Sequence, residues 1–179
     1  MFRQVEIFGL DSLEWETPTL RLSICPQMGA KIISLYHKPG DREWLVPPAG
    51  GRLELPGANR VFTACGLCGW DEMFPTIHSC RYPLNGQPSF ALPDHGEVWS
   101  LPWRVVEKDA NGCTLSVQGK LLPYQLERKL EIHPHSARLT FRYHLQNLSD
   151  EPLNWMWAAH PQFHALGQTI IRLPEHVNE

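Results

Sequence analysis

The alternation of apolar and polar residues between positions 137 and 146 constrains the fold of this chain more than any other feature. In the sequence ARLTFRYHLQ, every second residue is apolar and the residues between them are polar. A period of two places alternate side chains on opposite faces of a strand. The segment is therefore predicted to be a half-buried antiparallel strand.

Similar, looser alternation occurs in residues 114–121, 124–132, 20–24 and 30–37, with turn sequences such as Asn111-Gly112 between the runs. No window shows a helical stripe of apolar residues. The sequence thus predicts a mostly β chain built from hairpins. Residues 46–77 lack any period and are dense in Gly and Pro, which is typical of a segment that forms a binding or catalytic surface.

Composition limits the classes of function. The 179 residues are predicted to form one domain, 1–179, and the net charge of −3 gives no basic surface for nucleic acid or an anionic membrane. Neither a secretory signal nor a run of about 18 apolar residues is present. We therefore expect a soluble cytoplasmic protein without nucleic-acid or membrane partners, and its five cysteines are expected to be reduced thiols.

Two histidines are candidates for acid–base chemistry. His95 lies in LPDHGEVWSLPW between Asp94 and Gly96, and His160 lies in AAHPQF just before a proline that ends a predicted strand. Imidazole exchanges protons near neutral pH, so either ring could act on a polar, ring-shaped ligand. The competing interpretations are a loop histidine bonded to backbone for His95 and a buried structural histidine for His160.

A zinc site is the alternative use of residues 65–80. Cys65, Cys68, His78 and Cys80 supply a tetrahedral ligand set, but the His-x-Cys spacing is unusual and an apolar, aromatic run fills the interval. Ordinary buried cysteines are the preferred interpretation. We therefore predict that the protein holds no metal and no cofactor.

Four stretches together resemble the aldose 1-epimerase, or galactose mutarotase-like, family, and in particular a branch with a Gly-Trp-Asp-Glu motif. They are GAKIISLYHKPGDREWL (29–45), GWDEMFPTI (69–77), DHGEVWSLPW (94–103) and WAAHPQF (157–163), and they occur in the family's order. The resemblance implies a large antiparallel β-sandwich that binds a sugar across one sheet and its loops. Because the likeness covers the first half to two-thirds of the family domain, the sandwich is expected to be incomplete at its C-terminal side.

The resemblance also implies residue roles. His160 matches the general acid that protonates the ring oxygen of the sugar, and His95 matches a residue that hydrogen-bonds and places the sugar. Trp157 is also a candidate to pack on the sugar, but its apolar neighbours in the sequence favour packing in the core. The other candidate sugar-binding residues are Arg60, Asp71, Glu72, Asp94, Glu97, Trp70 and Trp99.

Anomer exchange needs an acid at the ring oxygen and a base at the C1 hydroxyl. The family's base is a glutamate in the later half of a longer chain, and it has no counterpart among these residues. Three functions therefore stay open: an aldose 1-epimerase acting on a hexose, a non-catalytic carbohydrate-binding module, and a zinc-stabilised β-domain. The expected partners are an uncharged sugar, because no phosphate loop is visible, and a second copy that pairs through exposed sheet edges.

Overall fold

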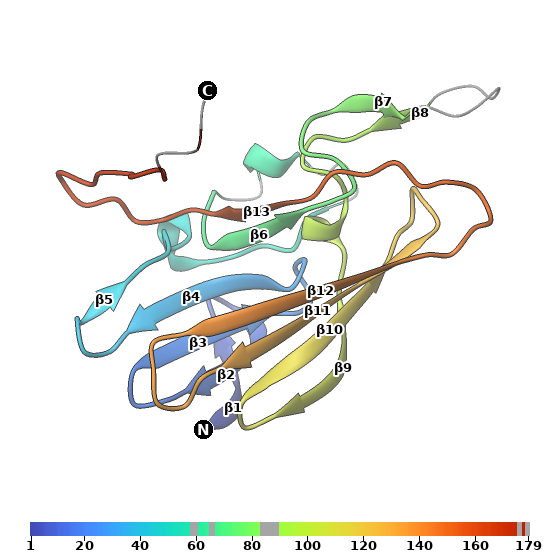
Figure 1. Ribbon diagram of the computed structural model, residues 1–179. Helices are drawn as coiled ribbons and strands as arrows, with labels where there is room; N and C mark the ends of the chain where they lie inside the picture. Colours follow the sequence, from blue (N-terminus) through green and yellow to red (C-terminus); the bar gives the residue numbers. More distant parts are fainter. Residues whose placement is uncertain (58–60, 65–66, 83–89, 175–176, 178–179) are drawn as a thin grey trace.

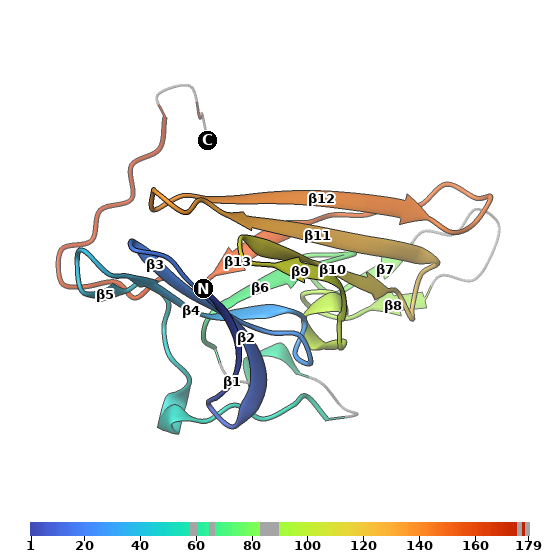
Figure 2. The same ribbon diagram turned by 90° about the horizontal axis from the view of Figure 1, so that it is seen from below.

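Two antiparallel sheets packed face to face form the computed structural model (Figures 1 and 2). It describes residues 1–179 except 58–60, 65–66, 83–89, 175–176 and 178–179. The first sheet runs in the spatial order β1 (Phe2–Ile7), β2 (Leu10–Glu16), β3 (Leu20–Cys25), β4 (Lys31–His37), β6 (Trp70–Met73) and β13 (Ala158–Pro161), with β5 (Arg42–Glu43) beside β4. The second runs β12 (Leu139–Asn147), β11 (Tyr124–Ile132), β10 (Gly112–Gln118) and β9 (Arg104–Asp109).

Smaller elements join these sheets. The strands β7 (Cys80–Tyr82) and β8 (Phe90–Leu92) pair as a separate two-stranded ribbon, and the 3-10 turns are η1 (Ala49–Gly51), η2 (Phe62–Ala64) and η3 (Val98–Ser100). Among the described residues, no helix has the length and apolar character needed to cross a membrane.

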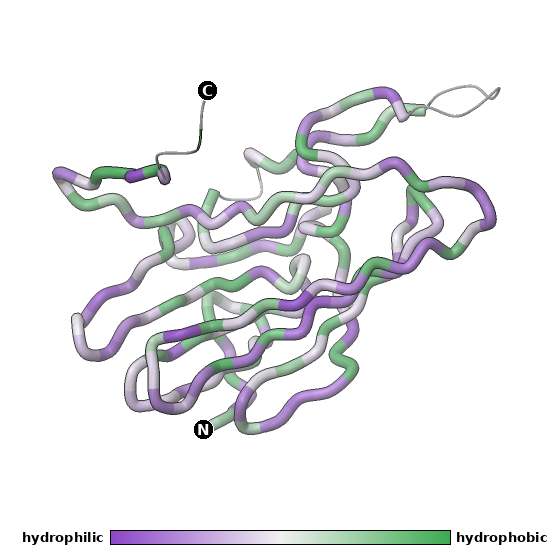
Figure 3. Tube along the Cα trace, in the orientation of Figure 1, coloured by the Kyte–Doolittle hydropathy of each residue, from purple (hydrophilic) through white to green (hydrophobic). Residues whose placement is uncertain are grey.

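The prediction of a mostly antiparallel β fold is confirmed. The strand expected at 137–146 is β12, whose apolar positions are half-buried while its polar positions are mostly exposed, and Figure 3 shows alternating colours along the long strands. The irregular segment of the sequence contains the short strand β6. This strand was not predicted, because its four residues show no alternation of apolar and polar side chains. The N-terminal hairpin of β1 and β2 was also not predicted.

The apolar core lies between the two sheets. Side chains such as Leu22 and Ile24 of β3 meet Leu115 of β10 and Leu126 and Leu130 of β11, all at most 2% exposed. Each fully buried aliphatic side chain of this kind stabilises the fold by roughly 1.5–3 kcal/mol relative to an exposed one. The alternation seen in the sequence therefore becomes a continuous inner layer.

The opposite face of the first sheet carries a second apolar cluster: Cys25, Met28, Ile33, Leu53 and Cys68. In Figure 2 the turquoise segment with η1 and η2 lies on this side, away from the second sheet. Strand β6 separates the two faces, because Trp70 packs on Phe141 of the second sheet, with 5.1 Å between ring centroids, and Asp71 must point the other way. We call the side that bears Asp71 the outer face.

Open strand edges lead to a prediction of self-association. Within the described residues, β12 pairs only with β11 and β13 only with β6, and the link between these edge strands exposes Trp155 and Met156 by 52% and 53%. Unpaired edges offer backbone donors and acceptors to another chain. We expect dimers or larger species in sedimentation velocity, and fewer of them for Met156→Lys than for the control Leu55→Lys, which alters an exposed residue of the irregular segment. A monodisperse monomer at every concentration contradicts this expectation.

Candidate functional site

His95 is held in an unusual backbone conformation. It follows β8 with φ of 62°, and Gly96 follows with φ of 67°. The His95 N–H donates to the Ile77 carbonyl over 3.1 Å, and a Cβ on Gly96 would lie 2.1 Å from the Phe74 carbonyl oxygen, so only glycine fits there. A non-glycine residue with positive φ costs of order 1–3 kcal/mol and such strain clusters at functional sites. The loop thus fixes the direction of the His95 side chain.

His160 reaches the same place from the other end of the chain. It lies on β13, directly opposite Asp71 of β6, and therefore projects from the outer face. The imidazole centroids of His95 and His160 are 5.2 Å apart, and their planes are inclined by 80°. The fold therefore brings the two candidate histidines together.

Phe62 completes this cluster, and sequence reasoning did not find it. Its ring stacks on His95 at 3.9 Å between centroids and 11° between planes, and it meets His160 edge-on at 5.4 Å. At 5% exposed it covers both imidazoles. The aperiodic segment that contains it was predicted to form a functional surface, but a single phenylalanine carries no pattern. Arg60, two residues earlier, lies outside the described residues.

The two tryptophans expected to contact the sugar are occupied by protein contacts. Trp99 in η3 is 2% exposed, donates from Nε1 to the Gly96 carbonyl over 3.1 Å and supports Phe62 edge-on at 5.2 Å. Trp70 faces the second sheet, where it packs on Phe141. The structure thus gives Trp99 a supporting position behind Phe62, whereas Trp70 belongs to the interior.

The carboxylates beside His95 differ in position. Asp94 is half exposed, and its Oδ2 lies 2.8 Å from His95 Nδ1 in ion-pair range, although the N–H direction does not align as a hydrogen bond. Glu97 is buried and accepts hydrogen bonds from the Lys120 and Leu121 amides and, over 2.9 Å, from the Tyr124 hydroxyl. Burial and the Glu97 charge both raise the pKa of Tyr124. Asp94 therefore joins the histidine cluster, while Glu97 anchors the second sheet.

Asp71 lies behind His160 and is completely buried. Its Oδ2 pairs with Lys31 Nζ over 2.7 Å, and Nζ also donates to the Cys68 carbonyl over 2.7 Å. Burial raises the pKa of the Asp71 carboxyl, and the Lys31 charge opposes that rise. Because neither charged group reaches solvent, Asp71 is placed next to the site without lining an open surface.

Glu72, the next residue, points into the sandwich. Its Oε1 accepts from Arg128 Nη1 over 3.0 Å and from the Tyr143 hydroxyl over 2.8 Å, and its Oε2 accepts from Trp157 Nε1 over 2.9 Å. Glu72 and Arg128 are both 0% exposed. The structure therefore separates the two acids of the Gly-Trp-Asp-Glu motif, with Asp71 on the outer face and Glu72 tying the sheets together.

Burial also sets the acidity of His160. Desolvation lowers its pKa, a positive charge on His95 lowers it further, and Asp71 raises it. Between this depressed pKa and the ordinary value of about 6.5, the unfolded chain binds more protons than the folded chain. Because of His160, the free energy of unfolding decreases as the pH falls below about 6.5.

Removing the Phe62 ring, which covers His160, is expected to raise the pKa of this imidazole. In Phe62→Ala the imidazole becomes better hydrated, which favours its charged form and raises the pKa of His160 towards about 6.5. The pH dependence of stability below that value should weaken accordingly. Proton NMR of the imidazole signals measures the pKa, and urea unfolding at several pH values measures the stability. An unchanged or lower pKa contradicts the assignment of burial as the main cause.

The described thiols do not form a metal centre. Cys68 lies in the outer apolar cluster, whereas Cys80 is exposed on β7 with its sulfur 3.6 Å from the Thr76 hydroxyl. No three or more His, Cys, Asp and Glu side chains converge as a metal site in the part of the chain that the structure describes. Cys65 lies outside that part.

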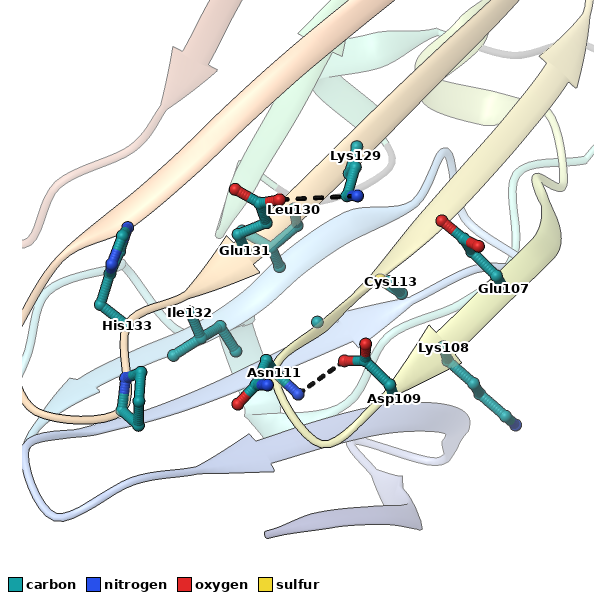
Figure 4. Close-up of a pocket in the computed structure, with 12 residues that line it drawn as sticks. Glu107, Lys108, Asp109, Asn111, Cys113, Lys129, Leu130, Glu131, Ile132 and His133 are labelled. Carbon is teal, nitrogen blue, oxygen red and sulfur yellow. Dashed lines mark hydrogen bonds and ion pairs between the residues drawn. The ribbon is translucent and has the colours of Figure 1, made fainter.

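A separate hollow of about 490 Å³ lies at the turn ends of β9 to β11 (Figure 4). Two pairs of its lining residues interact: Lys129 lies 3.5 Å from Glu131, and the backbone N–H of Asn111 donates to Asp109 Oδ1 over 2.7 Å. The hollow belongs to the second sheet, whereas His160 projects from the outer face of the first sheet and His95 lies beside it. The hollow is therefore not part of the candidate site formed by His95 and His160.

Comparisons with known proteins define the class of fold. Neither a family model nor a curated protein sequence matches the chain. Among solved structures, a galactose mutarotase-like protein from Lactobacillus casei superimposes with a TM-score of 0.68 at 17% identity, over 85% of this chain and 49% of that one. A galactose mutarotase related enzyme from Lactobacillus acidophilus gives 0.68 at 15% identity, over 88% of this chain and 50% of that one.

A putative aldose 1-epimerase from Escherichia coli K12 gives a TM-score of 0.59 at 15% identity, over 83% of this chain and 50% of its own. The fold is therefore that of the galactose mutarotase-like β-sandwich, as the sequence predicted. The chain spans about half the length of these structures. At such identities the likeness defines the fold alone, and the Gly-Trp-Asp-Glu branch stays a prediction.

Proposed function

We propose that this protein is an aldose 1-epimerase that interconverts the anomers of an uncharged hexose at His95 and His160. One observation carries the proposal: two histidines distant in sequence lie with ring centroids 5.2 Å apart on the outer face of a galactose mutarotase-like sandwich. Imidazoles in both protonation states are available near neutral pH. His160 can therefore give a proton to a sugar oxygen and take it back, while His95 beside it holds the sugar.

In the proposed reaction, protonated His160 gives its Nε2 proton to the ring oxygen of the sugar. The bond between C1 and that oxygen breaks, while the C1 hydroxyl loses its proton and becomes the carbonyl of the open chain. The base takes the proton of the C1 hydroxyl and returns it when the ring closes, a role that the resemblance assigns to a glutamate in the later half of the family domain. Rotation about the C1–C2 bond and reversal of these steps close the ring on either face of the carbonyl, which returns the proton to His160.

The other residues of the cluster have supporting roles in this proposal. His95, beside Asp94, hydrogen-bonds a sugar hydroxyl and holds the ring in register with His160. Phe62 covers both imidazoles, so an entering sugar displaces the ring or packs its C–H face against it. Arg60, in the segment just before Phe62, is proposed to contact sugar hydroxyls.

A non-catalytic sugar-binding module is the second candidate. The observation that favours it is the state of Asp71, because this carboxylate beside His160 is buried and paired with Lys31 and so is not free to act as the base. The same cluster would then bind a hexose through His95, His160 and Phe62 without opening its ring.

Two-dimensional exchange NMR on glucose and galactose separates these functions. An epimerase adds exchange cross-peaks between the α and β anomeric protons, whereas a binding module broadens the sugar signals without exchange. If neither sugar shows exchange or broadening, both functions are overturned. Buffer without protein and heat-denatured protein correct for spontaneous mutarotation.

A further inference from the structure

A row of three charged or titratable side chains crosses the outer face of the first sheet. Ile32 of β4 pairs with Trp70 of β6, so one residue along, Lys31 lies opposite Asp71. Asp71 in turn pairs directly with His160 of β13. Directly opposed residues of an antiparallel pair project from the same face with Cβ atoms about 4.5–5.5 Å apart. Lys31, Asp71 and His160 are therefore consecutive neighbours.

Only half of the Asp71 carboxylate is used by Lys31. Oδ2 accepts from Nζ, but Oδ1 is buried and has no hydrogen-bond partner among the described residues. His160 Nδ1 is likewise buried without a partner among them. An unpaired buried polar atom costs about 1–3 kcal/mol, so two such atoms on facing residues call for a common explanation. A carboxylate oxygen accepts and an imidazole N–H donates, which makes the two atoms complementary.

We propose that Asp71, held in place by Lys31, is a positioning residue that accepts a hydrogen bond from His160 Nδ1, directly or through one water molecule. The inference rests on the proposed function, in which His160 acts on the sugar. With Nδ1 bound to Asp71, the neutral imidazole carries its proton on Nδ1, and Nε2 faces the sugar. After protonation, the Nε2 proton is the one transferred to the ring oxygen.

The arrangement also supports the charged form of His160. Among the described residues, the charged or titratable groups that face this imidazole are His95 from the loop after β8, Lys31 from β4 and Asp71 from β6. Burial, His95 and Lys31 all lower the pKa of His160, and Asp71 opposes them. Asp71 thus keeps a larger fraction of His160 protonated near neutral pH, as a general acid requires.

Substituting Asp71 with asparagine tests this assignment. The amide oxygen must face the Lys31 ammonium, so the amide NH₂ faces His160 Nδ1 and turns it into an acceptor. We expect the neutral tautomer of His160 to switch from Nδ1–H to Nε2–H and its pKa to fall by about 1 unit, because the carboxylate charge is lost while Lys31 remains. The same logic of a wrong tautomer applies where an aspartate orients a catalytic histidine.

Long-range ¹H–¹⁵N NMR of the imidazoles, recorded from about pH 5 to 8, reports both quantities without any sugar. The double variant Lys31→Met/Asp71→Leu guards against a folding failure, because apolar replacement of a whole buried pair is often tolerated. It should abolish the preference for Nδ1–H. His95, beside Asp94, provides the internal control and should keep its tautomer in all variants.

The same variants separate this inference from the proposed function. A tautomer switch in Asp71→Asn supports the positioning role even where the chain shows no anomer exchange. If the chain is active, kcat should fall by about 10- to 100-fold with little change in KM. A His160 tautomer and pKa that stay the same in Asp71→Asn and in the double variant overturn the inference, whatever the activity.

Discussion

Glu72→Gln is expected to lower the free energy of unfolding by about 3–5 kcal/mol. The substitution removes the only negative charge that contacts the Arg128 guanidinium among the described residues, and Arg128 is 0% exposed. Arginine stays protonated at all ordinary pH values, so its charge remains buried. Since domains are typically stable by only about 5–15 kcal/mol, one unpaired buried charge would remove a large part of the stability. Urea unfolding followed by tryptophan fluorescence measures the loss.

Matched variants identify the buried charge as the cause. Glu72→Leu/Arg128→Met removes both charges and should recover most of the loss, because well-packed apolar replacements of a buried pair are often neutral. Glu131→Gln breaks the exposed pair with Arg142 and should leave the unfolding midpoint essentially unchanged. If Glu72→Gln behaves like Glu131→Gln, the network between the sheets does not stabilise the fold as argued.

His160→Asn is expected to slow anomer exchange by about 10²- to 10⁴-fold, the usual contribution of a positioned general acid. Asparagine fills a similar volume and can hydrogen-bond, but it cannot deliver a proton. The rate in exchange NMR, compared between the chain and the variant at equal sugar concentration, measures the effect. His135→Asn, in an exposed turn, is the control. A rate within about twofold of the parent chain contradicts the role of His160 as acid.

Local pattern was enough to predict three strands of the second sheet, β10 to β12, whereas the edge strand β9 was not predicted. Residues 124–132 alternate in the sequence and form β11, whose burial alternates in step. A half-buried strand is encoded within its own nine residues, so its prediction needs no knowledge of partners. The short strand β6 contains an acid on each face, and its position depends on contacts with Lys31 and Arg128 that lie far away in sequence.

The residues of the candidate site were predictable only where a local sequence motif marks them. His95 and His160 were found because each lies in a distinctive motif, and the fold brings them together. Phe62 carries no motif, and the separate environments of Asp71 and Glu72 follow from the two faces of a strand that sequence alone did not predict. Glu97 was grouped with His95 by proximity in sequence, whereas its carboxylate turns to Tyr124 and the loop before β11.

A hexose is proposed to bind where His95 and His160 meet. Titration of the ¹⁵N-labelled chain with galactose, followed in the imidazole region of long-range ¹H–¹⁵N spectra, tests it most directly, because all nine histidines report in one experiment. We predict saturable shifts of the His95 and His160 signals, with the remaining histidines unmoved. If only histidines outside this cluster shift, or if no histidine shifts with galactose or with glucose, a hexose does not bind at His95 and His160.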